Sequence, residues 1–154
     1  MKKTLLLLAA LLAAFVSAAP PSAGAAPRAR RAPTLKAEIT AVVTVESSPR
    51  ATTHKNGRRF LEFMALVRRF ELAPLRGSEG AELPRVIATR PVRVVHDLTC
   101  GGEPVGLRLG DAAELKGEYV HPPSGQDLIH FTHPADGSCG GRGTHPDGYL
   151  RRAR

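Results

Sequence analysis

The side chains best suited to chemistry lie close together near the C-terminal end of the chain. Three of its six histidines fall between residues 130 and 145: His130, His133 and His145. Asp147 follows two residues later. Imidazole titrates near neutral pH and is the commonest neutral metal ligand, and the surrounding proline, glycine and aspartate residues favour turns. This combination indicates a built site but does not name a reaction.

One hypothesis for this cluster is a metal-dependent hydrolase of the phosphodiesterase type. Zinc or another divalent transition metal would be held by His130, His133, His145 and Asp147. Such an ion takes three or four ligands of this type and, with one open position, activates a water. His145 and Asp147 would then be catalytic, with Arg142 on the developing charge. The spacing matches no strong zinc signature.

The competing interpretation is structural. Residues an odd number apart on a strand face opposite sides, so the two histidines at 130 and 133 converge only if the strand ends there. In a tight loop, the histidines would instead hydrogen-bond backbone carbonyls, and the His-Pro-Asp-Gly run at 145–148 would turn the chain.

The N-terminal residues predict export. Lys2 and Lys3 precede an apolar run from Leu5 to Val16, and small residues follow at 17 and 18. This is the pattern of a secretory signal peptide over residues 1–18, so the mature protein is expected to be periplasmic or secreted, and bacterial in style. The run is shorter than the roughly 20 apolar residues of a membrane-spanning helix, so no integral membrane segment is expected after cleavage.

The remaining chain is expected to hold one domain. Residues 19–33 are rich in proline, alanine and arginine without apolar periodicity, which predicts a disordered linker. Residues 34–150 suit a single domain with one core, and residues 151–154 would form a basic tail. The sequence sets no oligomeric state.

Alternating apolar and polar residues predict that this domain is built from strands. The expected strands are residues 35–46, 59–72, 92–98, 113–119 and 128–132. Asn56-Gly57 is a turn signal between the first two. For residues 59–72 a helix is the alternative, because Phe60, Phe63, Met64 and Val67 also fit helical spacing.

The order of these segments predicts an all-β fold. Five strands, a long first hairpin and an irregular segment before the fourth strand are typical of a small OB-like barrel, here with an irregular C-terminal loop. The alternatives are a small β-sandwich and an α+β domain.

Several segments resemble a known family. They are similar to the small exported bacterial proteins grouped as domain of unknown function 3465. The closing motifs carry this resemblance: Gly117-Glu118-Tyr119, Ile129-His130-Phe131-Thr132-His133 and His145-Pro146-Asp147-Gly148-Tyr149. The resemblance implies export and a small β-rich domain, and it implies no activity.

The two cysteines are expected to pair. Cys100 follows the third expected strand and Cys139 follows the fifth. In an OB barrel those strands are neighbours and parallel, so their ends emerge together. In an oxidising compartment the predicted disulfide would stabilise the fold by about 4 kcal/mol in the chain-entropy model. The alternative is a pair of free thiols; without a Cys-x-x-Cys motif, a redox enzyme is not expected.

The charge balance favours an anionic ligand. Removing Lys2 and Lys3 leaves 20 of the 22 basic side chains against 14 acidic ones, a net charge of +6. The predicted binding residues are Arg50, Lys55, Arg58 and Arg59 around the first hairpin, with His96 at the end of the third strand. Loops at this place in OB folds contact nucleic acids or oligosaccharides. The alternative is a solvated basic surface, since the chain has no tryptophan for base stacking.

The function predicted from the sequence is therefore binding, not catalysis. The ligand would be an anionic polymer or a small molecule held at the barrel end near the histidines and the basic loop. No Walker loop, nucleophile elbow or His-Glu-x-x-His motif supports an enzyme, and no cofactor is predicted with certainty; the metal-dependent hydrolase is the alternative.

Overall fold

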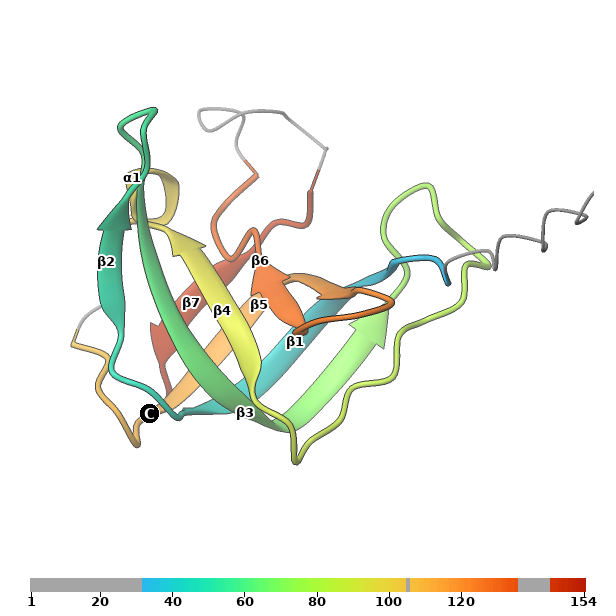
Figure 1. Ribbon diagram of the computed structural model, residues 1–154, viewed down its shortest axis with the longest axis horizontal. Coiled ribbons are helices and arrows are strands. Elements are labelled where there is room, and N and C mark those ends of the chain that lie inside the picture. The colour runs from blue at the N-terminus through green and yellow to red at the C-terminus, as the bar shows by residue number, and fades with distance from the viewer. Residues whose placement is uncertain (1–31, 105, 136–144) are drawn as a thin grey trace, which may run out of the picture. The chain divides into compact units, whose positions relative to one another are not determined.

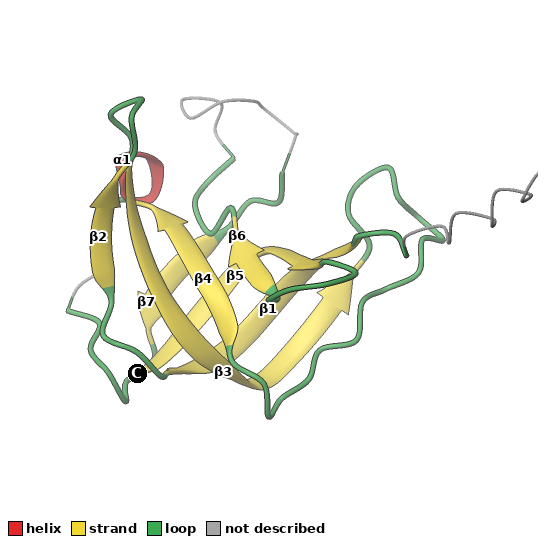
Figure 2. Cartoon of the chain, viewed as in Figure 1, coloured by secondary structure: helices red, strands yellow, loops and turns green. Residues whose placement is uncertain are grey.

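The computed structural model describes residues 32–104, 106–135 and 145–154. Within these ranges the regular secondary structure is all strand except for one short helix (Figures 1 and 2). The elements are β1 (Leu35–Val45), β2 (Arg50–Thr53), β3 (Arg59–Ala73), β4 (Val92–Asp97), α1 (Leu98–Gly101), β5 (Ala112–His121), β6 (Leu128–His130) and β7 (Tyr149–Arg152). The expected signal peptide, and all but the last two residues of the expected linker, lie outside the described residues.

Five strands close into a barrel. Their order is β1-β3-β4-β6-β5, and β5 pairs again with β1 to complete the circle. All of these pairings are antiparallel except β4 with β6, which is parallel. This order and this single parallel pair are those of an OB barrel, so the all-β prediction is confirmed. The sandwich and α+β alternatives are not what the chain forms.

The first strand shows why the chain closes this way. Its alternate residues from Ala37 to Val45 are buried, and the residues between them face outward, as the period of two predicts. It pairs with β5 along nearly its whole length and with β3 on its other side. The register with β3 shifts between Val42 and Val43, which leaves Arg68 as an extra, bulged residue.

The helical alternative for residues 59–72 is wrong. They form β3, in which Phe63, Ala65 and Val67 are buried alternately. Pairing with β1, β2 and β4 satisfies its backbone, and this tertiary pairing decides against the helical propensity of its leucine, glutamate and methionine residues. The predicted turn before it is confirmed, because Gly57 has a φ of 79° and its amide donates to the carbonyl of His54 at 2.9 Å.

The barrel interior is mainly apolar, and Tyr119 and Asp127 form a buried polar contact beside it. Ile39, Leu115 and Ile129 are fully buried, and burying each such side chain contributes about 2 kcal/mol. The buried Tyr119 hydroxyl donates to Asp127 Oδ2 at 2.7 Å. Burial and this carboxylate both raise the pKa of Tyr119, so the phenol stays protonated.

The expected basic tail is wrong for its first two residues. Arg151 and Arg152 belong to β7, which pairs with β5. Their side chains are also bonded: Arg151 donates to Glu114 Oε2 at 2.8 and 2.6 Å, and Arg152 donates to Asp111 at 3.0 Å. The barrel domain therefore continues through Arg152.

Candidate functional site

The three segments of the closing motif meet over the middle of β5, at Lys116 and Gly117. A Cβ on Gly117 would lie 2.5 Å from the carbonyl oxygen of His130, and one on Gly148 would lie 2.2 Å from that of Phe131. Both glycines are therefore required by close approach of backbones, which no side chain would allow. Gly148 also donates its amide to the His133 carbonyl at 3.0 Å. The turn expected through Asp147 and Gly148 is wrong, because residues 146–148 form no turn in the structure.

This packing holds a stack of rings around Phe131. Phe131 has a φ of 52°, a conformation that a bulky residue rarely adopts. Its ring lies parallel to that of His145, with 4.5 Å between centroids, and 4.1 Å from the ring of His130. The His133 ring meets that of His145 edge-on at 4.8 Å. The structure thus brings the three predicted histidines together, through Phe131.

Hydrogen bonds fix two of these imidazoles. Nδ1 of His133 lies 3.1 Å from the Pro134 carbonyl, and Nδ1 of His145 lies 2.8 Å from the Pro146 carbonyl. A carbonyl can only accept, so each Nδ1 carries the proton. In the neutral ring the Nε2 atom is then left as an acceptor.

His96 is a structural residue and not a ligand-binding one. Its side chain is 2% exposed, and its Nε2–H donates to the Gly102 carbonyl at 3.0 Å. Nδ1 consequently accepts from the Thr132 hydroxyl at 2.8 Å. Burial lowers the pKa of His96, so the ring is neutral. The prediction that it approaches His133 is confirmed, since both flank Gly101, but its buried ring has no nitrogen left for a ligand.

The structure does not gather the four predicted metal ligands. Among the described residues, one group of three has ligand atoms within 4.8 Å of one another: Asp97, Cys100 and His133. Of the predicted set only His133 belongs to this group. Asp97 is already occupied there, because its Oδ1 caps α1 at the Thr99 amide, 2.9 Å away, and its Oδ2 pairs with Arg58. A dication would have to displace that guanidinium.

Two predicted residues lie outside the part of the chain that the structure describes. Arg142, the predicted catalytic arginine, is one of them, and Cys139 is the other. Cys100, at the end of α1, accepts a hydrogen bond from Arg58 at 3.3 Å. The Cys100–Cys139 disulfide stays a prediction.

His130 contacts the buried carboxylate of Glu118. This carboxylate is 4% exposed and contacts Lys36 at 2.9 Å and His130 Nε2 at 3.2 Å. Burial is the largest single influence and raises the pKa of Glu118, but the bonds to His130 and Lys36 together outweigh it. The pKa of Glu118 therefore lies below its usual value, and His130 hydrogen-bonds to this buried carboxylate.

The basic hairpin is only partly free to bind anions. Arg58 pairs with Asp97, and Arg59 pairs with Glu103 at 3.2 Å. Arg50 and Lys55 are exposed and pair with no carboxylate among the described residues. Phe60 adds a platform that was not predicted, with the His54 ring 4.5 Å away and the Arg58 guanidinium 5.8 Å from its centroid.

A groove runs beside this hairpin over the outer face of β2, β3 and β4. Its volume is about 510 Å³. The polar and thioether side chains that line it are Ser47, Ser48, Arg50, Thr52, Glu62, Met64 and Arg93. Arg93 pairs with Glu62 and holds the pKa of that carboxyl below its usual range. Sequence patterns could not locate Glu62 and Arg93, because their contact depends on the β3–β4 register.

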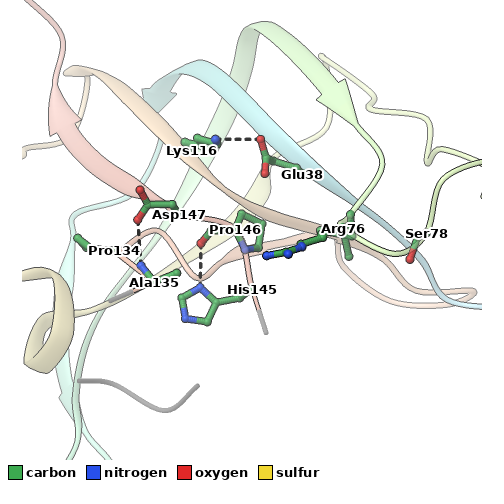
Figure 3. Close-up of a pocket in the computed structure, with 10 residues that line it drawn as sticks. Glu38, Arg76, Ser78, Lys116, Pro134, Ala135, His145, Pro146 and Asp147 are labelled. Carbon is green, nitrogen blue, oxygen red and sulfur yellow. Dashed lines mark hydrogen bonds and ion pairs between the residues drawn. The ribbon is translucent and has the colours of Figure 1, made fainter. Parts of the chain in front are cut away.

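A larger, separate cavity of about 810 Å³ opens beside His145, at the stack of Phe131 and histidine rings, which we call the histidine stack (Figure 3). Two predicted site residues line it, His145 and Asp147. Arg76 and Lys116 also line it, and sequence reasoning did not single them out. They come from the segment after β3 and from β5, which lie far apart in the sequence.

Comparisons with known proteins add no identification. The sequence matches no known family model and no curated protein, and no solved structure matches the chain. The likeness to the exported family therefore stays a prediction. Within the described residues, no helix is long and apolar enough to cross a membrane.

Proposed function

We propose that this protein is an exported OB-like binding module that holds an anionic polymer across the outer face of β2, β3 and β4. One observation carries the proposal: Arg50 lines this groove and, like Lys55 at the tip of the same hairpin, has no carboxylate partner among the described residues. In OB barrels the corresponding strands and the loop after the first strand contact extended ligands.

The groove offers contacts suited to a polymer. The exposed Arg50 is at the groove and Lys55 lies at the hairpin tip, so the two cations spread along the surface instead of enclosing one point. The Phe60 and His54 rings provide a stacking surface close to Lys55. Single-stranded nucleic acids bind without sequence preference when their bases stack on aromatic rings beside a positively charged groove.

The charge of Glu62 does not oppose this function strongly. Arg93 pairs with it directly, and Thr52 donates to its Oε1 at 3.1 Å. The pair leaves the centre of the groove close to neutral and Arg50 as the excess charge. Replacing Glu62 by glutamine should therefore raise the affinity for a polyanion severalfold.

The test is fluorescence anisotropy with a labelled oligothymidylate of about 20 nucleotides, longer than one OB barrel covers. The double variant Arg50→Glu, Lys55→Glu should bind at least tenfold more weakly than the unchanged protein. Losing two phosphate contacts should also reduce the slope of log K against log salt by about 1.4, because each contact to a single strand contributes about 0.7.

A matched control separates a local groove from overall charge. Arg85→Glu, Arg108→Glu changes the net charge equally at exposed positions outside the groove. It should lower affinity much less. Equal loss in the two double variants would show attraction to the whole basic surface and would overturn the assignment of the groove. No measurable binding by the unchanged protein at low salt would overturn the function.

The hydrolase alternative has less support. It requires His130, His133, His145 and Asp147 to converge on one ion, whereas His130 bonds to Glu118 and only His133 belongs to the one described group of three ligands.

A further inference from the structure

The cavity beside the histidine stack has a chemistry unlike that of the polymer groove. Its wall comes from β1, β5, the turn after β3 and the two segments on either side of residues 136–144. A volume of about 810 Å³ lies within the range of small-molecule sites. It is therefore a second candidate site.

The charges of the wall separate into a paired and an unpaired set. Lys116 and Glu38 form an ion pair at 2.9 Å and largely neutralise each other. Arg76 is exposed and pairs with no carboxylate among the described residues. Asp147 accepts the Ala135 amide on Oδ1 at 2.9 Å, which leaves its other oxygen able to accept from a ligand. One cation and one anion thus remain for a ligand.

The position of the Asp147 carboxylate is set before any ligand arrives, whereas the exposed Arg76 can still move. The Ala135 amide holds Asp147, and Figure 3 shows the Arg76 guanidinium on the other side of Pro146 from that carboxylate. His145 is fixed by its bond to the Pro146 carbonyl and by its stack on Phe131. Binding therefore costs little ordering of Asp147 and His145, and the ordering cost falls on Arg76 alone.

We propose that this cavity binds a small zwitterionic ligand, an amino acid or a short peptide with free ends. Its carboxylate would pair with Arg76, whose planar fork matches a carboxylate, and its ammonium group would donate to Asp147. Leu75 and Pro146 supply apolar contact for the ligand's side chains. A simple anion would pair with Arg76 but would be repelled by Asp147. A simple cation would pair with Asp147 but would be repelled by Arg76.

Calorimetric titration with alanine, dialanine and trialanine tests the proposal. The best binder of this series should lose affinity about tenfold or more when its amino group is acetylated, and likewise when its carboxyl group is amidated. Arg76→Gln should abolish the preference for the free carboxylate, and Asp147→Asn should abolish the preference for the free ammonium group. Each variant should keep the other preference.

Controls keep this site separate from the polymer groove. Arg85→Gln, an exposed change outside the cavity, should leave both preferences unchanged, and so should Arg50→Glu, Lys55→Glu. Equal affinity for free and blocked ligands would overturn the proposal. So would preferences that survive both cavity variants, or the absence of saturable binding up to about 10 mM, where affinity is already weak.

Discussion

Replacing Gly148 by alanine should destabilise the domain far more than its conservative chemistry suggests. The new Cβ would lie 2.2 Å from the Phe131 oxygen and 2.6 Å from the Lys116 oxygen, where ordinary contact begins at 3.4 Å. Both atoms belong to the backbone, so neither can rotate away. Separating the segments also stretches the 3.0 Å bond from Gly148 to His133.

The magnitude follows from these contacts. Overpacking of this kind costs about 1–3 kcal/mol, and the weakened backbone bond adds about 1 kcal/mol. We expect a loss of about 3 kcal/mol in the free energy of unfolding, measured by urea denaturation. Gly57→Ala is the control, because its φ is 79° but no atom lies within 4 Å of the new Cβ. It should cost about 1 kcal/mol through backbone strain alone.

The comparison also tests the reasoning about the histidine stack. Gly148→Ala must move the His145 segment away from Phe131, so the NMR signals of both rings should shift. If Gly148→Ala costs no more than Gly57→Ala and leaves the rings in place, the close approach of the two segments does not hold the stack together.

Three further outcomes follow from the same contacts. Because folding lowers the pKa of Glu118, the unchanged protein should be more stable than Glu118→Gln, with the full difference above about pH 4.5. The difference should vanish as the pH falls through the folded-state pKa, and a constant difference in urea unfolding from pH 2 to 7 would refute this. Arg58→Met should lower the free energy of unfolding by about 2 kcal/mol, because it leaves the 4% exposed Asp97 without its cation. This loss is smaller than for a fully buried ion pair, because Arg58 is partly exposed, and an unchanged midpoint of thermal unfolding would contradict the pairing. If Cys100 and Cys139 pair, thiol labelling of the unfolded, unreduced protein should find neither, and reduction should lower stability by about 4 kcal/mol; two labelled thiols would exclude the bond.

The barrel could be predicted because its signals are local and repeated. Alternation places the buried residues of β1 and β5, and the Asn56-Gly57 turn fixes the hairpin before β3. Once five strands are placed in this order, the parallel neighbours β4 and β6 follow from the OB topology. Those features depend on periods of two and on turn chemistry, which a sequence displays directly.

The short edge strands and the helix could not be predicted in this way. β2 and β7 have four residues each, too few for a period to stand out, and each exists because a longer strand accepts its backbone bonds. α1 begins after Asp97, whose side chain caps it with one oxygen while the other oxygen pairs with Arg58 from the β2–β3 hairpin.

The candidate site, too, could be predicted only in part. The cluster of histidines was visible, but their partners were not, because the roles of His96 and His130 depend on Thr132 and Glu118, which lie in or just after neighbouring strands. The sequence shows residue types, whereas hydrogen-bond partners depend on strand register. Gly148 looked like a turn residue and is instead a point of backbone contact.

The most direct test of the proposed function is an amide NMR map of the protein titrated with the oligothymidylate. We predict that the largest shifts fall on the groove residues, at Arg50, Thr52, Glu62, Met64 and Arg93, and extend to the hairpin tip. Shifts of similar size spread over all basic surfaces, or concentrated on β1, β5 and β7, which do not line the groove, would contradict the assignment of this face as the polymer-binding site.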